Sequence, residues 1–181
     1  MTTEVRTRKL VCLTGFMGSG KSTAGQLLAR QTGWPHVDLD KRIEEATSLQ
    51  IPDIFAQMGE PEFRRIEHDQ LVRVLGEANE AQQSRIVSLG GGTTAQACNL
   101  ALLRENGAVL VWLECPIEVL LPRCVQITNR PLFRDEASFR ELYRQRLPFY
   151  ALSDYRVDGN REPLRVVEQI LALGIFPKVT A

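Results

Sequence analysis

The sequence predicts an α/β fold in which a five-stranded parallel sheet is covered by helices on both faces. Short apolar runs alternate along the chain with longer amphipathic stretches, the order expected when parallel strands alternate with helices. Crossovers between parallel strands are right-handed, which places helices on both faces of the sheet. A glycine-rich segment separates the first apolar run from the first amphipathic stretch. Ligands of such folds bind beyond the carboxyl ends of the strands, and each motif described below falls there or in a nearby loop.

The order of the elements follows from these runs. Strands are expected at Leu10–Thr14, Pro35–Leu39, Arg85–Leu89, Ala108–Leu113 and Tyr155–Val157. Helices are expected at Lys21–Gln31, Leu39–Ala46, Ile51–Met58, Pro61–Leu75, Ala95–Asn106, Ile117–Val125, Ser138–Leu147 and Pro163–Ala172. A polar segment at about residues 123–138 predicts a lid near the site.

Length and composition fit a single globular domain over residues 1–181, with 44% hydrophobic and 24% charged residues. The 22 basic and 22 acidic residues balance, so the bulk charge does not indicate binding to nucleic acid or to an anionic membrane. No run reaches the ~20 apolar residues of a membrane span, and the N-terminus has no apolar signal segment. The four cysteines lack metal-binding spacing, which fits free thiols in a reducing compartment. We therefore expect a cytoplasmic protein.

The segment GFMGSGKST, residues 15–23, is the strongest motif and matches G-x-x-x-x-G-K-[ST]. Its glycines let the backbone point several N–H groups at phosphate oxygens, and the following helix adds its positive N-terminal end. Lys21 is expected to reach the β- and γ-phosphates, and the Ser22 hydroxyl to bind Mg²⁺. A glycine-rich turn with a chance lysine is the alternative, but a strand and a helix flank the motif as a nucleotide site requires. The sequence has no convincing [NT]-K-x-D motif, which disfavours a GTPase.

Asp38 and Asp40 lie at the end of the second expected strand. Residues two apart in an extended chain point to the same side. One carboxylate would then hold metal-bound water while the other takes the proton of an attacking hydroxyl. A strand-to-helix turn with Asp40 as the N-cap fits the same pattern, and these residues alone leave both interpretations open.

Arg64 and Arg65, in the segment GEPEFRR, fall in the early turns of a helix expected to begin at Pro61. Positive charge there opposes the helix dipole, which suggests a specific anionic partner. Surface pairing with Glu60 or Glu67 explains the arginines equally well.

Gly90, Gly91 and Gly92 directly follow the third expected strand. Three consecutive glycines expose backbone N–H groups and leave room for a ligand against the chain. A tight strand-to-helix turn rarely needs three glycines, so we favour a ligand.

Two more arginines belong to the fifth connection and the helix after it. Arg130 begins the segment RPLF in the polar stretch, where a lid can bring a cation to the transferring phosphoryl group. Arg146 ends the following helix, a position that favours a cation in any case.

Together these segments resemble the shikimate kinase family. The resemblance covers roughly residues 11–170 and rests on the P-loop with V-D-L-D, I-F-A-x-x-G-E-x-x-F-R, S-L-G-G-G, R-P-L and R-x-P-F-Y, in this order. It implies a three-layer P-loop kinase fold with a lid, in which residues of about 38–75 bind the acceptor. The implied activity is phosphorylation of the shikimate 3-hydroxyl by Mg·ATP, giving shikimate 3-phosphate and ADP, in chorismate and aromatic amino-acid biosynthesis.

The resemblance also implies a role for each matching residue. The ATP phosphates would be bound by Gly18, Ser19, Gly20, Lys21, Ser22 and Thr23, with Arg130 closing from the lid and Arg123 and Arg161 beside the adenine. Mg²⁺ would be held by Ser22 and, through water, by Asp38. Shikimate would be bound by Asp40, Arg64, Gly90, Gly91, Gly92 and Arg146. The catalytic groups would be Lys21, Asp40 and Arg130, with Asp40 as the base. The partners would be shikimate and ATP, without nucleic acid or membrane, and we expect a monomer.

Two departures from the family pattern concern the fifth connection. Pro122 lies inside the expected helix beside Arg123, and a proline there removes a helix hydrogen bond. Phe133 stands where the family usually has leucine. Two rival functions are a gluconate kinase of the same fold and a non-catalytic P-loop protein, and a panel of acceptor substrates would separate the three.

Overall fold

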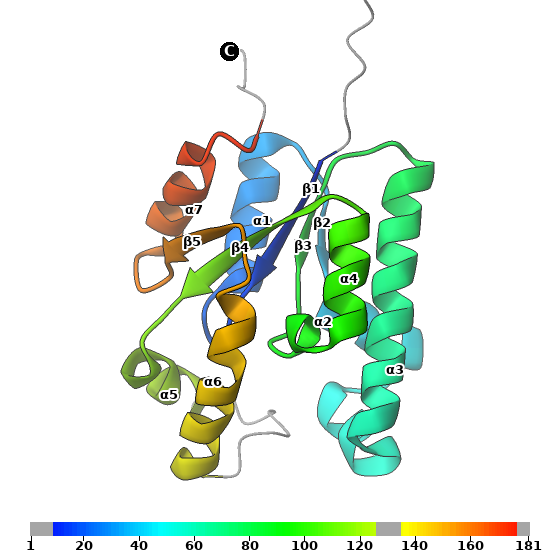
Figure 1. Ribbon diagram of the computed structural model, residues 1–181, viewed down its shortest axis with the longest axis vertical. Coiled ribbons are helices and arrows are strands. Elements are labelled where there is room, and N and C mark those ends of the chain that lie inside the picture. Colours follow the sequence, from blue (N-terminus) through cyan, green and yellow to red (C-terminus); the bar gives the residue numbers. More distant parts are fainter. Residues whose placement is uncertain (1–8, 126–134, 177–181) are drawn as a thin grey trace, which may run out of the picture.

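The computed structural model describes residues 9–125 and 135–176, and these form a sheet of five strands (Figure 1). The strand order is β2-β3-β1-β4-β5, and every neighbouring pair is parallel. The strands are β1 (Leu10–Thr14), β2 (His36–Asp38), β3 (Arg85–Ser88), β4 (Ala108–Glu114) and β5 (Tyr155–Asp158). The predicted α/β fold with a five-stranded parallel sheet is confirmed.

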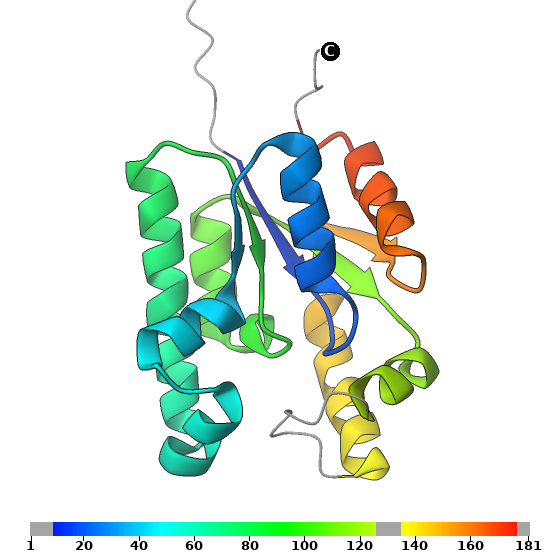
Figure 2. The same cartoon turned by 180° about the vertical axis from the view of Figure 1, so that it is seen from behind.

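Helices cover both faces of this sheet, as Figure 1 and Figure 2 show from opposite sides. One layer holds α1 (Lys21–Thr32) and α7 (Pro163–Ala172), and the other holds α3 (Ile51–Glu80) and α4 (Ala97–Glu105). The remaining elements lie toward the carboxyl ends of the strands: α2 (Leu39–Thr47), the 3₁₀ helix η1 (Thr93–Ala95), α5 (Ile117–Val125) and α6 (Glu136–Tyr150). The site expected at that edge is therefore surrounded by helices.

Alternation along the central strand β1 divides the core into two layers. Cys12 packs with Leu71 of α3 on one face of the sheet, whereas Val11 packs with Leu28 of α1 and Val167 of α7 on the other. Successive side chains of a strand point to opposite faces, so a fully buried strand must be apolar at every position that faces the helices. Each fully buried aliphatic side chain contributes about 1.5–3 kcal/mol, and these layers hold the strand ends in fixed positions.

A third apolar cluster lies beyond the ends of β1 and β4. It joins Phe16 of the P-loop and Trp112 of β4 to Phe139 and Tyr150 of α6. The Phe16 ring meets the Phe139 ring edge-on, with centroids 5.0 Å apart. This cluster fixes α6 against the loop that precedes α1.

Several helix boundaries differ from those that the sequence predicts. A continuous α3 replaces the helices predicted at Ile51–Met58 and Pro61–Leu75, but Gly59 breaks its geometry with φ 82° and ψ 169°, so the division falls where the sequence places it. The helix predicted at Ala95–Asn106 is instead η1 followed by α4, because Gln96 is extended between them.

The structure shows where the helix before the predicted lid ends and where the helix after it begins. The helix α5 continues through Pro122 to Val125, so Arg123 stays on it. The helix α6 begins at Glu136 because the Asp135 carboxylate caps it, accepting from the backbone N–H of Ser138 at 2.7 Å. Most of the predicted lid, with Arg130, lies outside the described residues.

The cysteines are free thiols, as predicted, with Cys12, Cys115 and Cys124 buried and Cys98 exposed. Burial raises the pKa of the Cys12 thiol to about 12, so it packs as a neutral apolar group. No helix within the described ranges is long and apolar enough to cross a membrane.

Candidate active site

The P-loop joins β1 to α1, and its shape depends on glycine at several points. Gly15, Gly18 and Gly20 have φ of 142°, 80° and 88°, values that L side chains rarely adopt. A Cβ at Gly15 would also lie 2.7 Å from the carbonyl oxygen of Leu113. The Lys21 ammonium donates to the carbonyl oxygens of Gly15 and Phe16, at 2.8 and 3.0 Å. Carbonyl oxygens of the loop thus hold its lysine in place.

The helix α5 supports the P-loop from outside. Arg123 donates from Nη1 to the carbonyl of Gly18 at 3.2 Å, and the Cys124 thiol lies 3.5 Å from the carbonyl of Met17. The Ser19 side chain is buried, and its hydroxyl has no hydrogen-bond partner among the described residues. Arg123, which the sequence places beside the nucleotide, therefore contacts the phosphate-binding loop directly.

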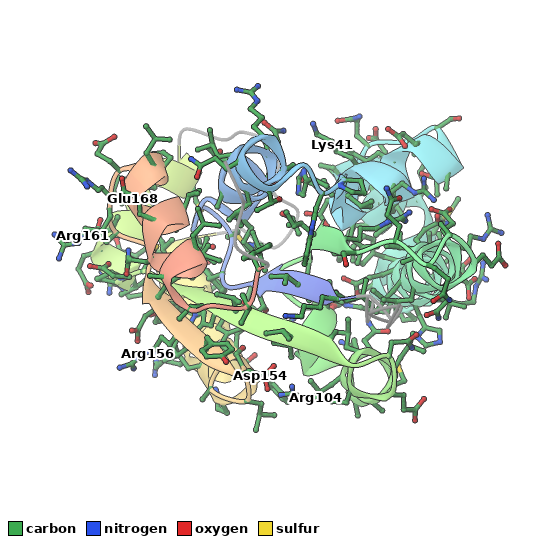
Figure 3. All side chains as sticks on the ribbon, turned by 90° about the horizontal axis from the view of Figure 1, so that it is seen from above. Lys41, Arg104, Asp154, Arg156, Arg161 and Glu168 are labelled. Atoms are coloured by element: carbon green, nitrogen blue, oxygen red, sulfur yellow. The ribbon has the colours of Figure 1, made fainter. Side chains whose placement is uncertain are left out.

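Arg161 lies in the connection from β5 to α7, on the exposed surface labelled in Figure 3. Its Nε donates to Asp158 at 2.7 Å. Hydrogen bonds from the Asn160 backbone and from Arg161 lower the pKa of the Asp158 carboxyl. Nothing in the described residues connects Arg161 to the P-loop, so its role beside the adenine stays a prediction.

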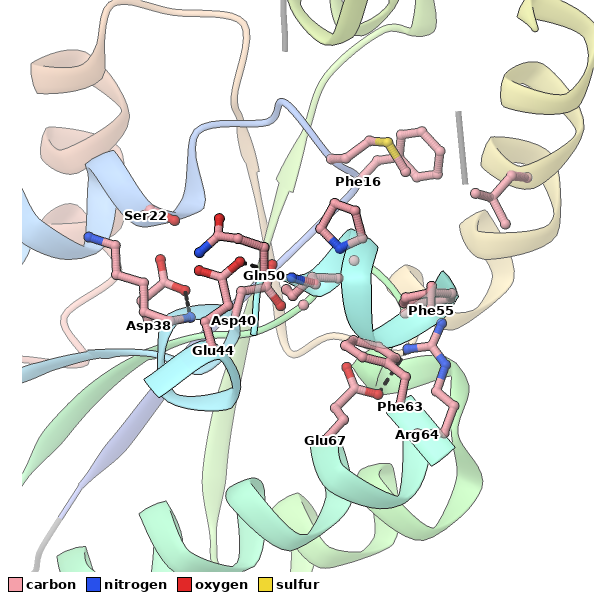
Figure 4. Close-up of a pocket in the computed structure, with 18 of the residues that line it drawn as sticks. Phe16, Ser22, Asp38, Asp40, Glu44, Gln50, Phe55, Phe63, Arg64 and Glu67 are labelled. Carbon is pink, nitrogen blue, oxygen red and sulfur yellow. Dashed lines mark hydrogen bonds and ion pairs between the residues drawn. The ribbon is translucent and has the colours of Figure 1, made fainter. Parts of the chain in front are cut away.

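A cavity of about 270 Å³ lies beside the P-loop (Figure 4). It collects all of the predicted acceptor and metal residues, namely Ser22, Asp38, Asp40, Arg64, Gly90, Gly91, Gly92 and Arg146. Figure 4 shows the acidic side chains of Asp38 and Asp40 on the side of Ser22, and Arg64 on the opposite side. The two aspartates and Arg64 therefore lie on different sides of the same cavity.

The two aspartates at the end of β2 differ in their local roles. Asp38, not Asp40, is the N-cap of α2, and its carboxylate accepts from the backbone N–H of Lys41 at 3.3 Å. Asp40 lies in the first turn of α2 and lines the cavity. The sequence-based alternative with Asp40 as the cap is thus wrong, because the chain already turns into the helix one residue after Asp38.

Arg64 is held by two carboxylates at the far end of the cavity. Its Nη1 donates to Glu67 at 2.9 Å and its Nη2 to Glu60 at 3.1 Å. The guanidinium also lies over the Phe63 ring, 5.1 Å from the centroid. Both pairings that the sequence offered as surface alternatives exist, yet the same side chain lines the cavity.

Arg146 reaches the cavity from α6, a helix far from Arg64 in the sequence. Within residues 9–125 and 135–176 it forms no ion pair. Burial lowers the pKa of the Arg146 guanidinium, and the charge of Arg64 lowers it further. Two neighbouring cations in a partly desolvated site favour the binding of an anion between them.

Glu67 is a residue of this site that sequence reasoning did not assign to it. Its side chain is 1% exposed and accepts from Arg64 and, at 2.6 Å, from the Thr93 hydroxyl. The i, i+3 spacing with Arg64 was visible in the sequence, but it equally fits an exposed pair. The cavity wall also includes Phe55, whose ring lies 4.5 Å from that of Phe63. These aromatic residues give the cavity one apolar face.

The glycine loop after β3 closes the cavity against the sheet. A Cβ at Gly90 would lie 3.0 Å from Oδ1 of Asp40, and one at Gly92 would lie 2.7 Å from Nη2 of Arg64. Side chains at these positions would displace the two polar groups that the cavity presents. The close approach of these groups explains the consecutive glycines better than a turn does.

The oxygen groups near the P-loop suit magnesium. Ser22 and Asp38 both line the cavity, and hydroxyl and carboxylate oxygens are ligands that Mg²⁺ prefers. The described residues contain no group of three or more His, Cys, Asp or Glu that would form a full metal cage.

A P-loop beside a cavity lined by aspartates and arginines, on a parallel sheet between two helix layers, defines a P-loop kinase. The family model for shikimate kinase matches residues 17–173. The chain is 39% identical to a shikimate kinase of Persephonella marina over 89% of its own length and 96% of that protein. The structure superimposes with a TM-score of 0.85 on shikimate kinase from Acinetobacter baumannii in complex with shikimate, at 31% identity and covering 96% of this chain and 97% of that one. A gluconokinase from Sinorhizobium meliloti, 19% identical with a TM-score of 0.59, shares the fold alone. The chain belongs to the shikimate kinase family.

Proposed function

We propose that the protein transfers the γ-phosphate of ATP to the 3-hydroxyl of shikimate, giving shikimate 3-phosphate and ADP in aromatic amino-acid biosynthesis. The observation that carries this proposal is the pair Arg64 and Arg146, which both line the cavity beside the P-loop and lie close enough for the charge of Arg64 to lower the pKa of Arg146. Membership of the shikimate kinase family and the likeness to a shikimate-bound structure support the same acceptor.

The chemistry of the cavity suits this acceptor. Shikimate is a small ring with one carboxylate and three hydroxyls. Its carboxylate would lie between Arg64 and Arg146, and each charge-assisted hydrogen bond there is worth about 1.5–3 kcal/mol. The ring would lie against Phe55 and Phe63, and the hydroxyls would face Asp40. The acid thus anchors one end of the ring and turns the other toward the nucleotide.

The residue roles are part of the proposal. Gly18, Ser19, Gly20, Lys21, Ser22 and Thr23 would bind the ATP phosphates, Arg123 and Arg161 would flank the adenine, and Arg130 would reach the transferring group. Asp40 would accept the proton of the attacking hydroxyl, and the glycine loop would offer backbone N–H groups to the acceptor. Because phosphoryl transfer depends on positioning and charge neutralisation, Lys21 would act by neutralising phosphate charge.

Mg²⁺ belongs to the same proposal, with Ser22 and, through water, Asp38 as its protein ligands. When bound, it would neutralise phosphate charge. The capping bond from the Lys41 backbone holds Asp38 at the end of β2, so this carboxylate keeps its direction toward the cavity. A monomer acting in the cytoplasm stays a prediction from the sequence.

The test is ADP release from Mg·ATP in the presence of shikimate, gluconate or a nucleoside monophosphate, with mass spectrometry of the product. We expect ADP release to depend on shikimate and the product to be its monophosphate. Turnover with gluconate instead of shikimate would keep the nucleotide site and refute the acceptor. Tight ATP binding without turnover on any acceptor would favour the non-catalytic P-loop protein.

A further inference from the structure

Tyr150, the last residue of α6, joins that helix to the glycine loop of the acceptor cavity. Its hydroxyl donates to the carbonyl oxygen of Gly91 at 2.6 Å, across 59 residues of sequence. The side chain is 1% exposed. The phenol is shielded from water, so this short hydrogen bond is worth more than a fully exposed one.

The Tyr150 ring cannot easily move away from this position. It packs against Trp112 of β4, with ring centroids 5.9 Å apart, inside the cluster that fixes α6 to the P-loop. Burial raises the pKa of the Tyr150 hydroxyl far above its usual range, so the group stays protonated and remains a donor. The geometry therefore supplies a rigid donor aimed at one backbone carbonyl.

The loop on the other side of this bond needs such support. Gly91 and Gly92 have no side chains that packing could hold, and glycine has the widest backbone freedom of all residues. Gly91 lines the cavity, and Gly92 lies against the Arg64 guanidinium. Rotation of the peptide between Gly91 and Gly92 would change both the cavity wall at Gly91 and the backbone that lies against Arg64.

The Tyr150 hydrogen bond also affects Arg146, the residue that would bind the acceptor's carboxylate. It lies one helical turn before Tyr150 on α6, so both side chains project from the same face of the helix. Leu142, a further turn back, also lines the cavity. Fixing Tyr150 to Gly91 thus fixes the distance between the α6 cation and the glycine loop.

We infer that Tyr150 is a positioning residue of the acceptor site, whose hydroxyl sets the glycine loop and Arg146 in one arrangement before shikimate binds. The inference rests on the proposed function. Tyr150 need not touch the substrate, because it acts through Gly91 and through the turn of α6 that carries Arg146. A preorganised site loses less conformational freedom on binding, so the effect belongs to acceptor affinity rather than nucleotide affinity.

The test compares Tyr150→Phe with Tyr143→Phe. Tyr143 lies on the same helix, and its hydroxyl also donates to a backbone carbonyl, that of Cys115 at 3.0 Å, away from the glycine loop. Each variant loses one tyrosine–carbonyl bond and keeps its ring. We expect Tyr150→Phe to raise the KM for shikimate about 10-fold and to leave the KM for ATP within about 2-fold. Tyr143→Phe should leave the shikimate KM within about 2-fold.

Hydrogen exchange of the backbone provides a second measurement that needs no turnover. In the substrate-free protein, Tyr150→Phe should speed amide exchange in residues 88–95 more than Tyr143→Phe does. An unchanged shikimate KM in Tyr150→Phe, or equal exchange in the two variants, would overturn the inference while leaving the proposed function intact. Wild-type protein without shikimate-dependent turnover would refute the proposed function, and exchange would then still decide whether Tyr150 orders the loop.

Discussion

Replacement of Arg64 by lysine tests whether the fork of its guanidinium, and not only its charge, is needed at the far end of the cavity. Arg64 donates to Glu67 from one nitrogen and to Glu60 from others, while the group also faces the cavity. Lysine keeps the positive charge but offers one compact ammonium group. In Arg64→Lys that group cannot stay bonded to Glu67 and present a second edge to a carboxylate.

The magnitude follows from the bonds that the acceptor would lose. One charge-assisted hydrogen bond is worth about 1.5–3 kcal/mol, and 1.4 kcal/mol is a factor of ten in affinity. Because Arg146 remains, we expect one such bond to be lost, which weakens shikimate binding about 10- to 150-fold. The P-loop contacts of Lys21 do not involve Arg64, so ATP affinity should stay within about 2-fold.

Isothermal titration with shikimate and, separately, with ATP measures both effects. Arg65→Lys is the matched control, since the Arg65 side chain is 61% exposed and pairs with Glu62 and Asp69 on the outer surface. Exposed pairs contribute little, so this variant should bind shikimate as the wild type does. Equal shikimate affinity in Arg64→Lys and wild type would refute the assignment of Arg64 to the acceptor carboxylate.

Two further variants probe the cavity, and a third probes the ion pairs of Glu77 with Arg42 and Arg85 outside it. Gly92→Ala keeps an allowed backbone, with φ −112°, but its Cβ would displace the Arg64 guanidinium, so shikimate KM should rise about 10-fold or more at unchanged ATP KM. Glu67→Gln removes the buried counter-charge, and calorimetry should show a loss of about 3 kcal/mol, or roughly 6–12 °C in Tm; an unchanged Tm would contradict the buried pair. Burial raises the pKa of Glu77, but hydrogen bonds from two arginines outweigh it and leave the pKa below its ordinary value. The ionised Glu77 carboxylate therefore stabilises the fold at pH values above its ordinary pKa, and this stabilisation is lost as the pH falls through the lowered pKa. The urea midpoints of wild type and Glu77→Gln should accordingly differ at neutral pH and converge in acid.

Local patterns in the sequence were sufficient for the sheet and the phosphate loop. The apolar runs predicted all five strands to within about two residues, the usual uncertainty of element ends, because period and hydrophobicity depend only on neighbours along the chain. The P-loop could be predicted equally well from the sequence, since its function depends on consecutive backbone groups. Helix ends were harder to predict: the cap at Asp135 and the extended residue Gln96 depend on local geometry that several sequences allow.

The acceptor end of the cavity shows where local patterns stop being informative. The sequence marked Arg64, the glycines and Arg146, but each alone also fitted a surface pair, a turn or a helix end. Only the packing of α3 and α6 around the glycine loop brings the two arginines into one cavity. Contacts between residues distant in sequence leave no periodic pattern. A single sequence therefore cannot show whether an arginine lines a shared cavity or points into solvent.

The sequence by itself therefore determined the parallel α/β architecture, the phosphate loop and the order of the family motifs. The tertiary structure decided that Glu67 is a buried partner of Arg64 and that Tyr150 bonds to Gly91. The physical reason is the same in each case. A side chain's burial and charge partners are set by elements that meet only after the helices have packed on the sheet.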